Sequence, residues 1–196
     1  MEHRAALRPF QAEPDLEALH LDAGASWRDG VLKLLFRLSG PLQTLVIPST
    51  GPQPQRRDGL WQSTCFEAFL AVPDQPAYWE FNLAPCGDWN LYALSSYREG
   101  LRPEPRITSL PCRWLRTPAL GRTDGVGLVE LAVTVNLNPL IPADTPLELS
   151  ATAVLEHQAG GCSYWAWQHG GPEADFHRRD SFQRLCDDGA SPTGPQ

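Results

Sequence analysis

Apolar and polar residues alternate along much of the chain with a period of two, the pattern of β-strands that bury one face. In residues 31–38 (VLKLLFRL) one face carries Leu32, Leu34, Phe36 and Leu38, and the other carries Lys33 and Arg37. Residues 64–72 are instead apolar on both faces apart from Thr64 and Glu67, as expected for a central strand. Strand patterns also occur in four further segments: 78–83, 128–135, 147–155 and 163–167.

Turn signals separate these segments. The chain has 16 Gly and 19 Pro among 196 residues, and only residues 14–19 (PDLEAL) look helical. Many short strands joined by turns predict an all-β fold, an antiparallel β-sandwich of immunoglobulin-like or jelly-roll-like type. We expect one domain over residues 1–186. Residues 187–196 are polar and rich in Gly and Pro, which predicts a disordered C-terminal tail.

Charge and composition narrow the classes of partner. The net charge is −7 and the isoelectric point is near 5.2, which argues against a nucleic acid or an anionic membrane surface. No apolar run is long enough to span a bilayer, and the first 20 residues lack the apolar core of a signal peptide. Five cysteines, an odd number without CxxC spacing, are expected to be reduced. We therefore expect a cytoplasmic protein.

Residues 78–100 (YWEFNLAPCGDWNLYALSSYREG) hold six of the chain's eighteen aromatic residues. Sugar-binding sites place aromatic rings against the C–H faces of a pyranose, while amides and charged groups hydrogen-bond its hydroxyls. Trp89 follows a turn, so it fits a ligand-binding surface and the plugged end of a sandwich equally well. The candidate ligand contacts of this stretch are Asn82, Asp88, Trp89, Asn90, Tyr92 and Arg98.

Three further tryptophans are candidates for ligand contact. In residues 163–167 (SYWAW) Trp165 and Trp167 share one strand face, where they form either a stacking platform or a layer of core. Core is the simpler interpretation. Trp61 follows a Pro-rich loop and lies close to charged residues, so we expect it to be more exposed.

His177 is the candidate among the histidines. Asp175, His177 and Asp180 lie close together in sequence, but no HExxH, HxH or CxxC pattern accompanies them. Polar residues with a structural role are therefore the simpler interpretation, and no metal is predicted. The chain also lacks GxSxG, a glycine-rich phosphate loop and GxGxxG, so the sequence does not predict an enzyme.

Taken together, residues 60–70 (LWQSTCFEAFL), 78–100 and 163–182 (SYWAWQHGGPEADFHRRDSF) resemble the DOMON-like proteins related to family 9 carbohydrate-binding modules. A weaker similarity begins at Ser26, so the resemblance covers nearly the whole chain. It implies a β-sandwich of two antiparallel sheets with a non-catalytic binding role. The wider superfamily has two ligand classes: carbohydrates gripped between Trp side chains, and b-type haem held by axial side chains.

The first hypothesis is a module that binds a carbohydrate or a similar small polar ligand, with Trp61, Trp89, Trp165 and Trp167 as the tryptophans to test. The alternative is a b-type haem-binding module. Because the sole methionine is Met1, a haem would need axial ligands from His157, His169, His177 or Lys33. An enzyme, or a protein partner held in a groove, is a third hypothesis. The sequence leaves the cofactor open, with haem as its one candidate.

Overall fold

The computed structural model describes residues 2–49, 51, 53–117 and 126–185. This part of the chain is all-β: it contains twelve strands, four short 3-10 turns and no α-helix. The strands are β1 (Glu2–Pro9), β2 (His20–Arg28), β3 (Val31–Gly40), β4 (Cys65–Ala71), β5 (Tyr78–Leu83), β6 (Trp89–Leu94), β7 (Arg102–Pro103), β8 (Cys112–Thr117), β9 (Gly127–Asn136), β10 (Glu148–Glu156), β11 (Cys162–Ala166) and β12 (Gln183–Arg184). The 3-10 turns are η1 (Pro14–Leu16), η2 (Leu42–Thr44), η3 (Leu60–Gln62) and η4 (Arg179–Ser181).

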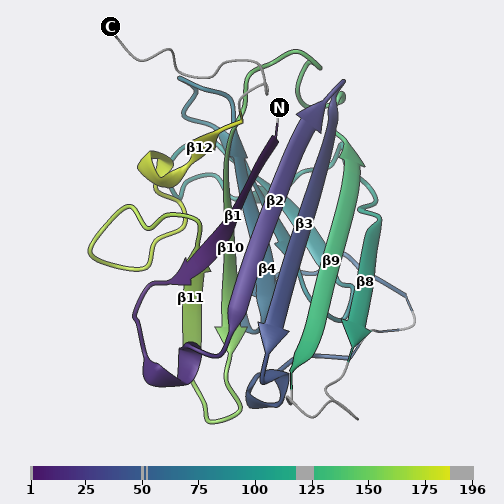
Figure 1. Ribbon diagram of the computed structural model, residues 1–196. Helices are drawn as coiled ribbons and strands as arrows, with labels where there is room; N and C mark the ends of the chain where they lie inside the picture. The colour runs from purple at the N-terminus through teal and green to yellow at the C-terminus, as the bar shows by residue number, and fades with distance from the viewer. Residues whose placement is uncertain (1, 50, 52, 118–125, 186–196) are drawn as a thin grey trace, which may run out of the picture.

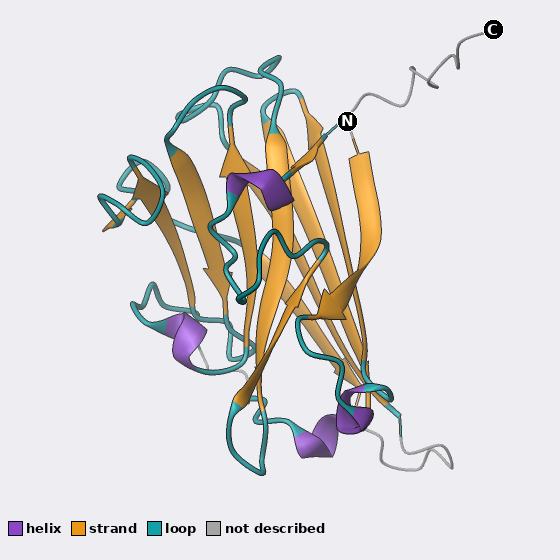
Figure 2. Ribbon diagram, turned by 90° about the vertical axis from the view of Figure 1, so that its left-hand side faces the viewer, coloured by secondary structure: helices purple, strands orange, loops and turns teal. Residues whose placement is uncertain are grey.

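The strands form two layers (Figures 1 and 2). The first layer has the order β1-β2-β3-β9-β8, and the second has the order β7-β6-β5-β4-β10-β11, with β12 paired to β10. Every strand pair is antiparallel. Strand β1 joins the layers, because its first part pairs with β2 whereas Arg8 and Pro9 pair with β11. The predicted antiparallel β-sandwich of one domain is confirmed.

The main core lies between the two layers. The apolar face of β3 packs against residues of β4, and the rings of Phe36 and Phe66 lie 5.4 Å apart across the layers. Residues on alternating positions of β2, β9 and β10 complete this core. The period-two pattern of the sequence therefore reports the inward face of each strand.

A second, smaller apolar cluster lies on the outer side of the second layer. Phe69 of β4 and Tyr78 of β5 point away from the main core and pack against Phe182. The connection between β11 and β12, residues 167–182, covers these strands and adds Phe176 to the cluster. Strand β4 is consequently buried on both faces, as residues 64–72 predict.

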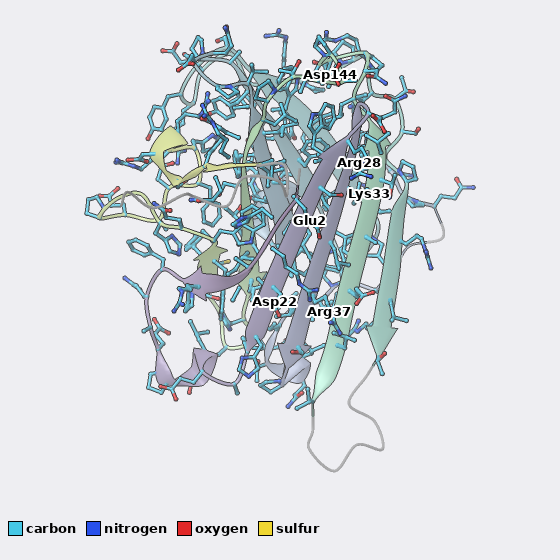
Figure 3. The ribbon with its side chains drawn as sticks, turned by 45° about the horizontal axis from the view of Figure 1, so that its top comes forward. Glu2, Asp22, Arg28, Lys33, Arg37 and Asp144 are labelled. Atoms are coloured by element: carbon cyan, nitrogen blue, oxygen red, sulfur yellow. The ribbon has the colours of Figure 1, made fainter. Side chains whose placement is uncertain are left out.

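The outer side of the first layer is different. Figure 3 shows acidic and basic side chains interspersed over β2 and β3, among them Asp22, Lys33 and Arg37. Arg37 pairs with Glu130 of β9 at 3.1 Å, with both side chains partly exposed. The described residues include no helix long and apolar enough to cross a membrane. The predicted tail, residues 187–196, lies outside the described residues.

Candidate ligand-binding pocket

A pocket of about 350 Å³ lies on the outer side of the second layer, away from the charged face of Figure 3. Strands β4, β5, β6, β10 and β11 supply its floor, and η3, residues 98–101 and the β11–β12 connection supply its rim. The floor residues are Glu67, Phe69, Glu80, Leu94, Val154 and Tyr164, and the rim residues are Trp61, Arg98, Leu101, Ala174, Phe176 and His177.

Strand register brings two glutamates together on this floor. Glu67 of β4 is directly opposite Asn82 of β5, and Glu80 is two positions further along β5 on the same face. Diagonal neighbours of this kind lie roughly 7–8 Å apart. Both side chains are buried, at 2% and 5% exposure.

The two glutamates have unequal hydrogen bonding. Asn82 Nδ2 donates to Glu80 Oε1 at 2.7 Å, and Thr152 Oγ1 donates a long bond to Glu67 Oε2 at 3.4 Å. Glu67 Oε1 is buried and has no hydrogen-bond partner among the described residues. A buried polar atom of this kind is uncommon in native proteins and is consistent with a missing ligand.

The glutamates hold their protons more tightly than ordinary carboxyl groups. Burial raises the pKa of Glu67 well above its usual value, and repulsion from Glu80 raises it further. Burial also raises the pKa of Glu80, while Asn82 and Arg98 oppose that shift. Perturbed carboxyl groups inside a pocket are typical of functional sites.

His177 enters the pocket from the β11–β12 connection. Its Nδ1 is hydrogen-bonded to the Tyr78 hydroxyl at 2.8 Å, and its ring packs edge-on against Phe69, with centroids 5.0 Å apart. Burial lowers the pKa of His177 to about 4, with a smaller contribution from Arg98. The imidazole is therefore neutral near pH 7.

Arg98 and Asp175 fix one side of the rim. Arg98 has a left-handed backbone (φ 56°), which is uncommon for a residue with a side chain. Its guanidinium pairs with Asp175 at 2.8 Å, and Asp175 also accepts hydrogen bonds from the Tyr97 hydroxyl and from the His177 N–H. Asp175 thereby ties the turn after β6 to the connection that carries His177.

Exposed aromatic rings stand at the pocket's edge. Trp61 is 37% exposed and packs edge-on against Tyr92, with ring centroids 5.8 Å apart. Tyr164 of β11 is 43% exposed and packs edge-on against Phe176, with ring centroids 6.1 Å apart. Because β11 lies four strands away from β6, the two exposed rings approach the pocket from different sides.

Of the residues singled out in the sequence, Trp61, Arg98 and His177 line this pocket. Tyr92 and Asn90 support it, because the Tyr92 hydroxyl and Asn90 Nδ2 both donate to Asp58 Oδ1, at 2.8 and 3.0 Å. Asn82 is fully buried beside Glu80. Asp88 holds the loop before η3, by accepting the Gln55 N–H at 2.9 Å and pairing with Arg57 at 2.9 Å.

The structure corrects the prediction that three of the tryptophans contact a ligand. Trp89, Trp165 and Trp167 face the core between the layers and do not line the pocket. Trp89 begins β6 opposite Leu83, so the strand alternation turns it inward. Trp165 is opposite Ala153 of β10, and Trp167 Nε1 donates to the carbonyl oxygens of Ala5 and Ala23. These rings are 3–9% exposed, which leaves no face for a sugar.

The residues named for haem are dispersed. His157 Nε2 is hydrogen-bonded to Ser163 Oγ, and His169 Nε2 to the Arg8 carbonyl. Lys33 and His177 lie on opposite outer faces of the sandwich. Among the described residues, no group of three or more His, Cys, Asp or Glu is placed to hold a metal, and the four described cysteines form no disulfide. The haem alternative stays a prediction that no contact in this geometry favours.

The sequence interpretation missed several residues that line the pocket. Glu67, Glu80, Tyr164 and Phe176 were not among the candidate residues, although all four line the pocket. One signal was available: Glu67 is an acid in the middle of an otherwise apolar strand segment. A central-strand carboxylate must meet a polar partner or a ligand, and that requirement marks the face it shares.

No protein-family model and no curated protein sequence matches the chain. Among solved structures, a proposed carbohydrate-binding protein from Bacteroides uniformis superposes with a TM-score of 0.65 at 12% identity, covering 93% of this chain and 85% of that one. The two proteins share a fold. A family 9 carbohydrate-binding module from Caldicellulosiruptor kristjanssonii, in complex with cellotriose, has a TM-score of 0.46 at 12% identity over 98% of this chain and 88% of that one.

A family 9 carbohydrate-binding module from Caldicellulosiruptor kristjanssonii in complex with glucose gives a TM-score of 0.40 at 11% identity, over 94% of this chain and 84% of that one. The structural neighbours are thus a proposed carbohydrate-binding protein and family 9 modules, as the resemblance implies. At 12% identity, the likeness to the Bacteroides uniformis protein shows the fold alone. The DOMON-like part of the resemblance stays a prediction.

Proposed function

We propose that the pocket over β4, β5 and β10 binds a carbohydrate or a similar small polar ligand without catalysing a reaction. The observation that carries this proposal is Glu67 Oε1, a buried acceptor without a partner on the floor of an aromatic-rimmed pocket. A pocket of about 350 Å³ is within the range of small-molecule sites.

The chemistry of the pocket matches that of a sugar. The exposed faces of Trp61 and Tyr164 are apolar surfaces on which ring C–H groups can pack. A hydroxyl that donates to Glu67 Oε1 removes the penalty of an unsatisfied buried acceptor, on the order of 1–3 kcal/mol. One sugar can therefore pack on the aromatic rings and hydrogen-bond the buried glutamate at the same time.

The arrangement of the acids supports binding rather than hydrolysis. Glycosidases place two carboxyl groups on either side of the scissile bond. Here Glu67 and Glu80 stand side by side on adjacent strands of one floor. The structural neighbour from Bacteroides uniformis is itself described as carbohydrate-binding, which adds support at the level of the fold.

Replacing the exposed tryptophan tests the proposal. Trp61→Ala should lower sugar affinity about five- to tenfold, because a lost aromatic contact is worth about 1–1.5 kcal/mol. The measurement is isothermal titration with glucose and cellotriose after a glycan screen. Leu115→Ala is the matched control: Leu115 is an equally apolar exposed residue, 53% exposed, on β8 of the other layer. Undiminished binding by Trp61→Ala would contradict the proposal.

A further inference from the structure

The two glutamates of the pocket floor form a pair of buried carboxyl groups. Glu67 and Glu80 are diagonal neighbours, and both are almost completely buried. Among the described residues no lysine lines the pocket, and the arginine that does, Arg98, has its guanidinium hydrogen-bonded to Asp175. The pocket therefore offers two carboxyl groups to a ligand, and one of them has a free oxygen, Oε1 of Glu67.

The other titratable groups around the pair do not supply a positive charge near pH 7. Burial lowers the pKa of His177, so its ring is neutral. Burial raises the pKa of Tyr78 and of Cys65, so both groups stay protonated and uncharged. Arg98 lowers the pKa of Glu80, but by less than burial raises it. Two desolvated carboxyl groups thus face the pocket, and the Arg98 guanidinium that acts on Glu80 is already paired with Asp175.

The cavity beside the pocket is also acidic. A second cavity of about 940 Å³ adjoins the pocket, and Tyr164 and Ala174 line both. Glu13, Asp15 and Glu173 line this second cavity, and no lysine or arginine in the described part of the chain does. Walls of one charge raise the local concentration of ligands of the opposite charge.

We propose that the pocket prefers a sugar that carries a protonated amine, with the ammonium group donating to Glu67 Oε1 and facing Glu80. This inference rests on the proposed function. An ammonium group has three donors and a full positive charge, so it satisfies the free oxygen and removes the repulsion between the two acids. A neutral hydroxyl satisfies the oxygen but leaves the repulsion. Where Glu67 holds a proton in the free protein, the ammonium displaces that proton to solvent.

The test compares three sugars that differ at one substituent. Glucose, glucosamine and N-acetylglucosamine are titrated calorimetrically into the whole chain at about pH 6.5, where the amine is charged. Glucosamine should bind about tenfold more tightly than both neutral sugars. Glu67→Gln, which keeps the shape but not the charge, should reduce this preference to threefold or less. Glu130→Gln, on the far layer, is the matched acid control and should leave it unchanged.

The outcomes distinguish a failure of the amine preference from a failure of the proposed function. Equal binding of glucose and glucosamine, weakened about five- to tenfold by Trp61→Ala, overturns the amine preference and leaves the proposed function in place. Binding of none of the three sugars or of cellotriose overturns both. Ethanolamine that binds as tightly as glucosamine overturns the requirement for a sugar ring. Should Glu67→Gln fail to fold, Glu80→Gln also leaves a single carboxyl on the floor, and an undiminished preference in that variant contradicts the inference.

Discussion

Glu67 is unfavourable for the stability of the folded protein, but it offers a ligand a buried hydrogen-bond acceptor. It lies in the middle of β4, in which every residue is buried, and its Oε1 has no partner among the described residues. Burial and the proximity of Glu80 both disfavour its charged form. Such a residue weakens the folded state and is retained where a ligand needs it.

The stability of the protein should therefore depend on pH through this residue. Because the folded-state pKa of Glu67 is raised, the folded state binds its proton more tightly, and stability falls as pH rises from the unfolded value near 4.5 through the folded value. Glu67→Gln should remove this decline and be more stable near pH 8, by about 1–3 kcal/mol. Urea unfolding at pH 4, 6 and 8 measures the difference. If Glu67→Gln is less stable than the original protein by the same amount at every pH, the Glu67 carboxyl does not cause the decline.

At the scale of elements, the strands were predictable where one face meets the core. Residues 78–83 coincide with β5, and residues 31–38 and 128–135 lie inside β3 and β9. The predicted segments do not include β1, β2, β6 and β8, nor the two-residue strands β7 and β12. The sequences of β1, β2 and β8 mix small, polar and apolar residues, and pairing with neighbours rather than side-chain pattern defines them.

The pocket was less predictable than the strands, for a physical reason. Its floor depends on the register of β4 against β5 and β10, which sets Glu67 opposite Asn82 and Thr152. Its rim depends on how the β11–β12 connection folds back over the second layer. Both are long-range arrangements, and local alternation carries no information about them. For the same reason the sequence did not decide which tryptophans face the core.

The β11–β12 connection is anchored by Arg179. This side chain donates to the carbonyl oxygens of Gln75 and Val72, at 2.6 and 3.3 Å, and to Glu148 Oε2 at 2.8 Å. Its guanidinium also lies over the Phe182 ring, 5.2 Å from the centroid. One arginine therefore ties η4 to the β4–β5 turn and to β10.

Arg179→Ala should loosen the connection that carries Phe176 and His177. We expect a loss of about 2 kcal/mol in unfolding free energy, because charged hydrogen bonds to two backbone carbonyl groups and to Glu148 are removed. Hydrogen exchange in residues 168–182 should accelerate, and sugar affinity should fall with it. Arg178→Ala is the neighbouring control, since Arg178 is exposed and pairs with Asp180 two residues away. Equal exchange in the two variants would show that Arg179 does not anchor the connection.

The whole molecule has two unlike outer faces. One is a solvated sheet face with interspersed charges (Figure 3), and the other carries the aromatic-rimmed pocket with its buried acids. Strand β1 joins the two layers into one sandwich, so the pocket stands on a rigid scaffold. A sugar bound as proposed contacts the second face and leaves the first unaffected.

The seven tryptophans provide the most direct measurement of where a ligand binds. Each indole N–H gives its own signal in a ¹H–¹⁵N spectrum, and only Trp61 combines exposure with a place on the pocket. Titration with glucosamine and with glucose should shift the Trp61 signal most and leave Trp89, Trp165 and Trp167, which lie in the core, close to their original positions. Shifts confined to those core tryptophans or to Trp114 of β8, or no shift with either sugar, would contradict the assignment of this pocket as the binding site.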